Sequence, residues 1–103
     1  MIHVLAIVTA HAGQRDAVLA AFGANMPAVH AEAGCHHYEP VIDVAAAGPI
    51  QTPLGPDSFA VIEQWESMDH LKAHAASAHM KEYGAKVRDL LASRTIHVLT
   101  SAA

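Results

Sequence analysis

Histidine is the residue type that stands out in this sequence of 103 residues, with nine copies. Imidazole exchanges protons near neutral pH and is also a common metal ligand. His70 and His74 are four residues apart in a segment with helical spacing, so they share one face of the expected helix. A metal site would need a third ligand from the fold, such as His36, His37 or Glu63. We favour the interpretation without a metal, in which His70 is solvated and His74 points inward.

Glu63 and Trp65 form a second group that could do chemistry. They alternate along an expected strand at residues 58–65, so their side chains share one face. A carboxylate on such a face is either an ion-paired core group, with His74 as one partner, or a polar group in a pocket. Trp65 suits the core or a pocket wall, and Tyr38 could offer a hydroxyl at the rim of that pocket.

Composition narrows the class of protein. The net charge is -4, and the six Lys and Arg residues are scattered, which argues against nucleic acid binding. No apolar run approaches the roughly 20 residues of a membrane span. The single cysteine, Cys35, excludes an internal disulfide and is expected to be an inert thiol, so we expect a cytoplasmic location. Hydrophobic residues make up 52% of the chain, a weak indication of a partner because 22 of them are alanine.

Apolar periodicity and turn residues predict one domain, residues 1–103, with six elements. Strands are expected at residues 2–9, 35–44, 58–65 and 95–100, and helical regions at residues 15–31 and 68–92. Pro27 should kink or interrupt the first helix, Ser67 should cap the second, and residues 76–78 could bend it.

This order predicts an α+β fold of the ferredoxin-like βαββαβ kind, with a four-stranded antiparallel sheet and both helices on one face. The other face would be bare, and a second copy of the same sheet is its simplest cover, so we expect a homodimer. Residues 45–57 hold three prolines and two glycines and should form a long loop, a candidate for reaching the partner.

Several motifs resemble those of one known family. They are Glu32-Ala33-Gly34-Cys35-x-x-Tyr38, Ile62-Glu63-Gln64-Trp65-Glu66-Ser67, His70-Leu71-x-x-His74 and His79-Met80-x-x-Tyr83. With them the chain resembles the antibiotic biosynthesis monooxygenase family, and within it the bacterial quinol monooxygenase branch. The resemblance implies a dimeric α+β barrel with a pocket between sheet and helices in each subunit. It also implies oxidation of a naphthohydroquinone-like or polycyclic phenolic substrate by O₂, without a metal and often without a bound cofactor, although a flavin is possible.

Other functions remain open on the same fold. Haem-degrading relatives ligate iron through a histidine whose counterpart here is Gly84, and glycine cannot ligate iron. A related isomerase acts on a phosphorylated signalling sugar, which would need basic phosphate contacts that are few here. A different class is a quinone-binding or stress-associated dimer without turnover.

The mechanism that we expect begins with proton removal from the hydroquinone. A phenol has a pKa of about 10 and a histidine one of about 6.5, so proton transfer from the phenol to histidine costs roughly 5 kcal/mol. Hydrogen-bond donors must therefore stabilise the anion. His74 is the expected base, oriented by Glu63, with His79 as second choice. The expected substrate-binding residues are Trp65, Tyr38 and Asn25 as donors and Phe22, Met80 and Tyr83 as the wall.

Overall fold

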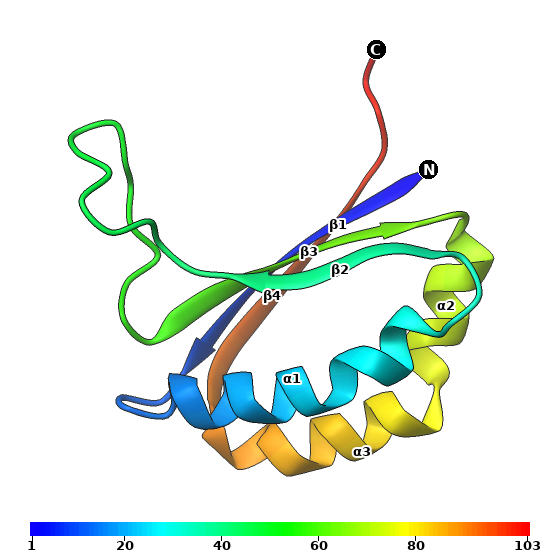
Figure 1. The fold of residues 1–103 in the computed structure, drawn as a ribbon, viewed down its shortest axis with the longest axis horizontal. Helices are drawn as coiled ribbons and strands as arrows, with labels where there is room; N and C mark the ends of the chain where they lie inside the picture. Colours follow the sequence, from blue (N-terminus) through cyan, green and yellow to red (C-terminus); the bar gives the residue numbers. More distant parts are fainter.

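A four-stranded antiparallel sheet is covered on one face by three helices (Figure 1). The computed structural model describes all residues 1–103. The strands are β1 (Ile2–Ala10), β2 (Cys35–Val41), β3 (Ser58–Trp65) and β4 (Leu91–Leu99), and they lie in the order β2-β3-β1-β4. The helices are α1 (Arg15–His30), α2 (Met68–Ala76) and α3 (Ala78–Val87), followed by one 3₁₀ turn, η1 (Arg88–Leu90). The predicted ferredoxin-like α+β fold is confirmed.

The core lies between the central strands and the helices. Alternation along β1 buries Val4, Ala6 and Val8 toward the helices, and Phe59 and Trp65 on β3 do the same. The two strands pair along their whole length, from Ile2 opposite Trp65 to Thr9 opposite Ser58. This rigid pair of strands supplies the platform from which Glu63 and Trp65 project together, as the sequence predicts.

Element boundaries differ from the prediction at the second half of the chain. The last helical region ends at Leu90 instead of residue 92, and β4 begins at Leu91 instead of residue 95. Leu and Ala are strong helix formers, so the segment after Leu90 has a misleading local preference. Pairing with β1, from Ala10 opposite Leu91 to His3 opposite Leu99, outweighs that preference. The second strand is also shorter than predicted, ending at Val41.

Helix caps and breaks fall close to where the sequence places them. Ser67 caps α2, because its hydroxyl accepts the backbone N–H of His70 at 3.3 Å. The expected bend within residues 76–78 is a full break: Ser77 is extended, with ψ of 152°, and separates α2 from α3. Pro27 lies inside α1, which continues past it to His30.

Gly34 makes the turn between α1 and β2 possible. Its φ is +80°, a conformation that L side chains avoid, and a Cβ there would lie 2.4 Å from the ring of His70. His70 is held in this position by a hydrogen bond of 2.8 Å between its Nδ1 and the hydroxyl of Ser67. His70 is therefore packed against this turn, whereas the sequence predicts a solvated side chain.

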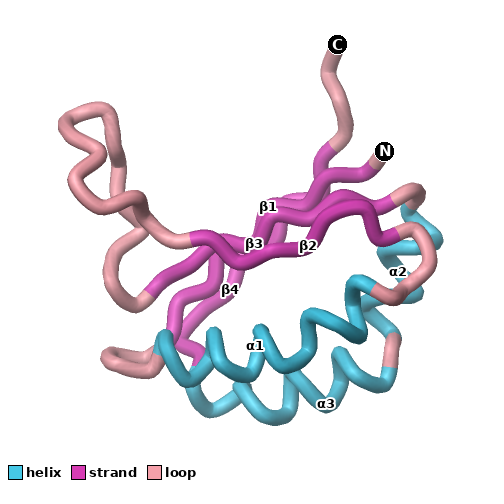
Figure 2. Tube along the Cα trace, viewed as in Figure 1, coloured by secondary structure: helices cyan, strands magenta, loops and turns pink.

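The face of the sheet opposite the helices has no cover within one chain (Figure 2). Leu5, Ile62 and Leu99 lie on this face, and their exposed fractions are 37%, 39% and 48%. Ile96 and Val98 of β4 are also about half exposed although they point to the helix side. A large apolar sheet surface is thus available for burial against a partner.

The segment between β2 and β3, residues 42–57, is the long loop that the sequence predicts, and it extends away from the body of the domain (Figure 1). Asp43 organises it: its carboxylate accepts the backbone N–H groups of Leu54 at 2.8 Å and Gly55 at 2.9 Å. These hydrogen bonds hold the pKa of Asp43 below its ordinary value. Ile50, in the same loop, is 92% exposed.

None of the helices has the length and apolar character that crossing a membrane requires.

Candidate active site

A cavity of about 590 Å³ lies between the sheet and the helices. Its floor includes Val4, Ala6 and Val61 of the central strands, and its far side includes Arg94 and Ile96 of β4. Most of its lining is hydrophobic, and its volume falls within the roughly 300–1,000 Å³ of small-molecule sites. Such a space suits a flat aromatic molecule that carries a few polar groups.

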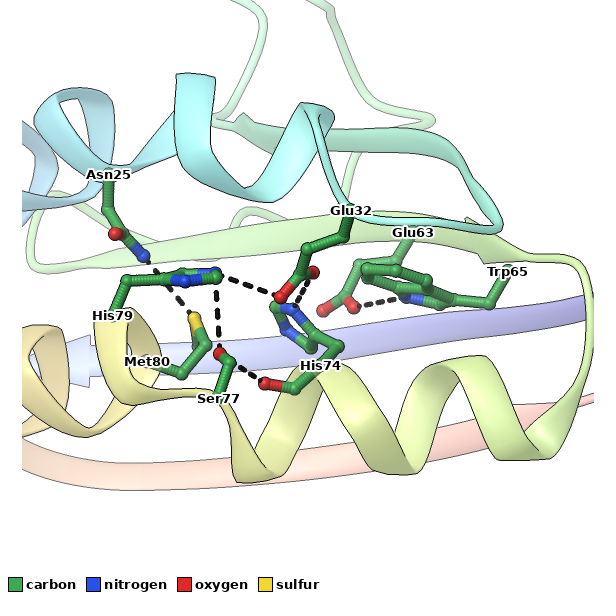
Figure 3. Close-up of polar contacts among 8 residues, drawn as sticks. All are labelled: Asn25, Glu32, Glu63, Trp65, His74, Ser77, His79 and Met80. Atoms are coloured by element: carbon green, nitrogen blue, oxygen red, sulfur yellow. Dashed lines mark hydrogen bonds and ion pairs between the residues drawn. The ribbon is translucent and has the colours of Figure 1, made fainter.

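The cavity gathers six of the nine site residues that the sequence predicts. These are Phe22, Tyr38, Glu63, His74, Met80 and Tyr83. The other three, Asn25, Trp65 and His79, are not part of its lining. Asn25 instead donates from its amide nitrogen to the sulfur of Met80 at 3.3 Å, so it supports the wall from behind (Figure 3). Trp65 is completely buried beneath the site.

One carboxylate, that of Glu32, joins two histidines (Figure 3). Its Oε2 lies 2.7 Å from Nδ1 of His74, and its Oε1 lies 2.8 Å from Nε2 of His79. His74 is buried, and the side chain of Glu32 is 15% exposed. A carboxylate accepts hydrogen bonds from both rings, so each neutral histidine places its proton on the nitrogen that faces Glu32.

The break at Ser77 brings the two histidines together. On a continuous helix His74 and His79, five positions apart, would point about 140° away from each other. Because Ser77 is extended, α3 starts in a new direction and His79 turns back toward the end of α2. The hydroxyl of Ser77 donates to the carbonyl oxygen of His74 at 2.7 Å, which fixes the junction.

His74 presents its second nitrogen to the cavity. Its ring packs on Trp65, with ring centres 4.6 Å apart, and on Tyr38 at 5.4 Å. Its Nε2 has no hydrogen-bond partner in the protein. Nε of Arg15 is the only side-chain nitrogen or oxygen that is both fully buried and without a partner, so Nε2 of His74 must be partly exposed. Nε2 of His74 is therefore accessible from the cavity that His74 lines. With the proton on Nδ1, this nitrogen carries a lone pair and can accept a proton from a ligand.

Glu63 has a different partner from the one that the sequence predicts. We expected it to orient His74, but its Oε1 accepts the indole N–H of Trp65 at 2.9 Å, and Glu32 orients His74. The reason is the strand itself, since residues two apart on one face are neighbours. Burial raises the pKa of Glu63, while the bond from Trp65 and the nearby His74 oppose the rise. The Trp65 N–H is thus occupied and is not free for a ligand.

Two tyrosine hydroxyls complete the polar lining. Burial raises the pKa of Tyr38 strongly, and raises the pKa of Tyr83 to about 12. Both hydroxyls therefore keep their protons at neutral pH and can donate hydrogen bonds. Phe22 fixes the two rings, stacking on Tyr38 with centres 5.0 Å apart and meeting Tyr83 edge-on at 5.9 Å.

Sequence reasoning missed charged residues of this region, among them Glu32 and Arg94. Glu32 follows the C-terminus of α1, where the helix dipole disfavours an anion, and that misfit was an available signal. Arg94 lines the cavity from β4, and its charge partly opposes the rise in the pKa of Glu63 and Tyr83. Extending the alternation of β4 backward from Ile96 would have placed Arg94 on the same face.

Comparison with known proteins identifies the family. Residues 1–86 match the family described as antibiotic biosynthesis monooxygenase. A protein of Escherichia coli strain K12 named "Probable quinol monooxygenase YgiN" is 42% identical over 101 residues, covering 96% of each chain.

Solved structures agree in fold. PA3566 from Pseudomonas aeruginosa has a TM-score of 0.80 at 25% identity, covering 99% of this chain and 94% of that chain. Rv0793 from Mycobacterium tuberculosis also gives 0.80 at 25% identity, covering 99% and 95%. A protein from Nitrosomonas europaea, 16% identical and fully covered, gives 0.84 and adds evidence for the fold alone. The chain therefore belongs to the antibiotic biosynthesis monooxygenase family and is an oxidoreductase.

Proposed function

We propose that the chain is a quinol monooxygenase that oxidises a naphthohydroquinone-like substrate with O₂. The relative named as a quinol monooxygenase supports this substrate class. The observation that carries the proposal is the accessible Nε2 of His74, fixed as a base by Glu32 at one end of a largely apolar cavity. A flat hydroquinone fills such a space and offers one hydroxyl to His74.

His74 accepts the hydroquinone proton, and the tyrosine hydroxyls of Tyr38 and Tyr83 donate to the quinol oxygens. Transfer of a proton from a phenol to imidazole costs roughly 5 kcal/mol in water, so these donors must stabilise the anion that forms. Arg94 adds a positive charge to the same lining. Glu63 also lines the cavity, and burial raises the pKa of its carboxyl. Apolar walls exclude water around the reacting ring.

The substrate supplies every electron that the reaction needs. A hydroquinone and O₂ give a hydroxyquinone and one water: one oxygen atom enters the ring, and the other leaves reduced. No external reductant enters this balance, so we propose catalysis without a metal or bound organic cofactor. Haem is disfavoured because Gly84 stands where haem-degrading relatives have their iron-ligating histidine, and glycine offers no ligand. We keep the cytoplasm as the expected location.

We further propose that the chain is a homodimer with its sheets face to face. The exposed apolar side chains of Leu5, Ile62 and Leu99 support this arrangement. Ile50, at 92% exposed, lies in the loop that would reach the partner. Burial of this surface contributes on the order of 25 cal/mol per Å² of apolar area before the costs of association.

Oxygen uptake with purified protein and menadiol, compared with the uncatalysed rate, tests the function. We expect His74→Ala to lower the catalysed rate well over tenfold while the dimer stays folded. His11→Ala, a change at an exposed histidine in the β1–α1 turn, is the control and should keep the wild-type rate. Quinone binding without added oxygen uptake by the wild type would favour a non-catalytic quinone-binding protein instead.

A further inference from the structure

Glu32, His74 and His79 are the one place in the structure where three metal-ligating side chains meet. One ligand atom from each residue lies within 4.8 Å of the other two. The surface pairs His36–Glu66 and His37–Glu39 each offer only two ligands. Two imidazoles and one carboxylate are a donor set that suits Zn²⁺ and its first-row neighbours, with water in the fourth position.

The two contacts of Glu32 are close to the ligand separations that a metal would need, and all three ligand atoms lie within 4.8 Å of one another. Nitrogen and oxygen ligands about 2.0–2.1 Å from a tetrahedral Zn²⁺ lie about 3.3 Å from one another. The two contacts of Glu32, now 2.7 Å to His74 and 2.8 Å to His79, would therefore open by about half an ångström. The side chain of His79 is 28% exposed at the start of α3, so the core does not enclose it on all sides. That exposure also gives a cation a path from solvent.

This site is separate from the cavity, although one histidine belongs to both. Glu32 and His79 are not part of the cavity lining, and His74 faces them through Nδ1. A cation bound here would be on the opposite side of the His74 ring from a quinol at Nε2. It would not touch the substrate oxygens, so it would not act on them as a Lewis acid.

A cation at Nδ1 changes what Nε2 can do. Neutral imidazole that binds a metal through one nitrogen carries its proton on the other. Nε2 of His74, the proton acceptor when Glu32 holds the Nδ1 proton, would become an N–H donor. We propose that a divalent cation of the zinc class binds between Glu32, His74 and His79. By moving the His74 proton to Nε2, the cation prevents His74 from accepting a proton from the substrate. The inhibitory half of this inference rests on the proposed function.

Binding is tested on the full-length protein without an affinity tag, using Co²⁺ absorption and titration with Zn²⁺ against a chromophoric chelator. We expect one ion per chain, with the visible spectrum of tetrahedral Co²⁺. His79→Gln should weaken binding more than about tenfold, because it removes a ligand and keeps a hydrogen-bond donor toward Glu32. His36→Gln, a change in a surface pair, should leave the affinity as it is. No binding, or equal affinity in His79→Gln, overturns the site.

The change in His74 is read by ¹⁵N NMR, independently of any turnover. Zinc should move the His74 proton from Nδ1 to Nε2, and the same spectrum should not change in His79→Gln. Zinc should also inhibit menadiol-dependent oxygen uptake by the wild type, with at least a tenfold smaller effect on His79→Gln relative to its own zinc-free rate. Bound zinc with an unmoved proton or an unchanged rate overturns the inhibitory role. A wild type without any menadiol-dependent uptake would overturn the proposed function, while Co²⁺ and NMR still decide the metal site.

Discussion

Glu32 and His74 are 42 residues apart in the sequence and are joined by a hydrogen bond of 2.7 Å between Oε2 and Nδ1. The bond fixes which nitrogen of His74 carries the proton, and so it sets the function of the nitrogen that faces the cavity. Glu32 does not line that cavity. It is therefore a positioning residue, and its effects should be separable from substrate binding.

We expect Glu32→Gln to lower kcat for menadiol oxidation at least about tenfold and to change KM little. The amide cannot accept from both histidines, and it can donate to Nδ1 of His74, which would place the proton on the wrong nitrogen. Steady-state kinetics on both parameters measure the split.

Glu66→Gln is the matched control for this change. Glu66 also pairs with a histidine, His36, but both side chains lie at the surface. We expect wild-type kinetics from this variant. Similar losses in Glu32→Gln and Glu66→Gln, or an effect on KM alone, would show that Glu32 does not position the base.

Glu63→Gln should make the protein more stable at neutral pH. Burial raises the pKa of Glu63 above its ordinary 4.5, so the folded state holds the proton more tightly than the unfolded state. The contribution of Glu63 to the free energy of unfolding of the wild type is therefore complete below pH 4.5. It is lost as pH rises through the pKa that Glu63 has in the folded state. Glutamine keeps the acceptor for the Trp65 N–H and has no charge to bury.

Urea unfolding of both proteins at pH 4 and pH 7 measures this difference. We expect similar midpoints at pH 4 and a higher midpoint for the variant at pH 7. Glu82→Gln, on the exposed side of α3, should show no such pH-dependent gain. A variant that loses stability at pH 7 would mean that the Glu63 carboxylate is held as a favourable charge.

Local pattern was enough to predict the fold. Alternation in β3 and helical spacing in α1 gave those elements within one residue of their observed ends. The same pattern placed Glu63 and Trp65 on one buried face. It failed at residues 91–94, where the preference of Leu and Ala for helix is overruled by pairing with β1, a contact more than 80 residues away in the sequence.

The partners within the site were harder to predict than its members. His74 was correctly expected to point inward, because the helical spacing fixes its direction. Its partner Glu32 comes from a turn whose path depends on Gly34 and His70, and no local periodicity describes such a turn. The contact of His79 with the same carboxylate requires the full break between α2 and α3 at Ser77, whereas the sequence indicated only a bend.

Ile62→Lys should convert the proposed homodimer to a monomer. Ile62 lies on the uncovered face of central strand β3, and two lysine charges would face each other across the interface. Met68→Lys is a close control, because Met68 is 39% exposed like Ile62 but begins α2 in the helical layer. Light scattering after size exclusion should give a halved mass for Ile62→Lys alone. A wild-type monomer, or a dimeric Ile62→Lys, would contradict the sheet-to-sheet arrangement.

Gly34→Ala should destabilise the domain by at least about 2 kcal/mol. Alanine at φ of +80° is strained, and its Cβ would lie 2.4 Å from the His70 ring, which the bond to Ser67 holds in place. Gly23→Ala is the control: Gly23 lies in α1 with no atom within 4 Å of an added Cβ, and alanine should stabilise that helix by about 0.5–1 kcal/mol. Chemical unfolding of the two variants under one condition should therefore give shifts of opposite sign. Because this turn carries Glu32, Gly34→Ala should also lower kcat, and a stable, fully active variant would contradict the role that we give to the turn.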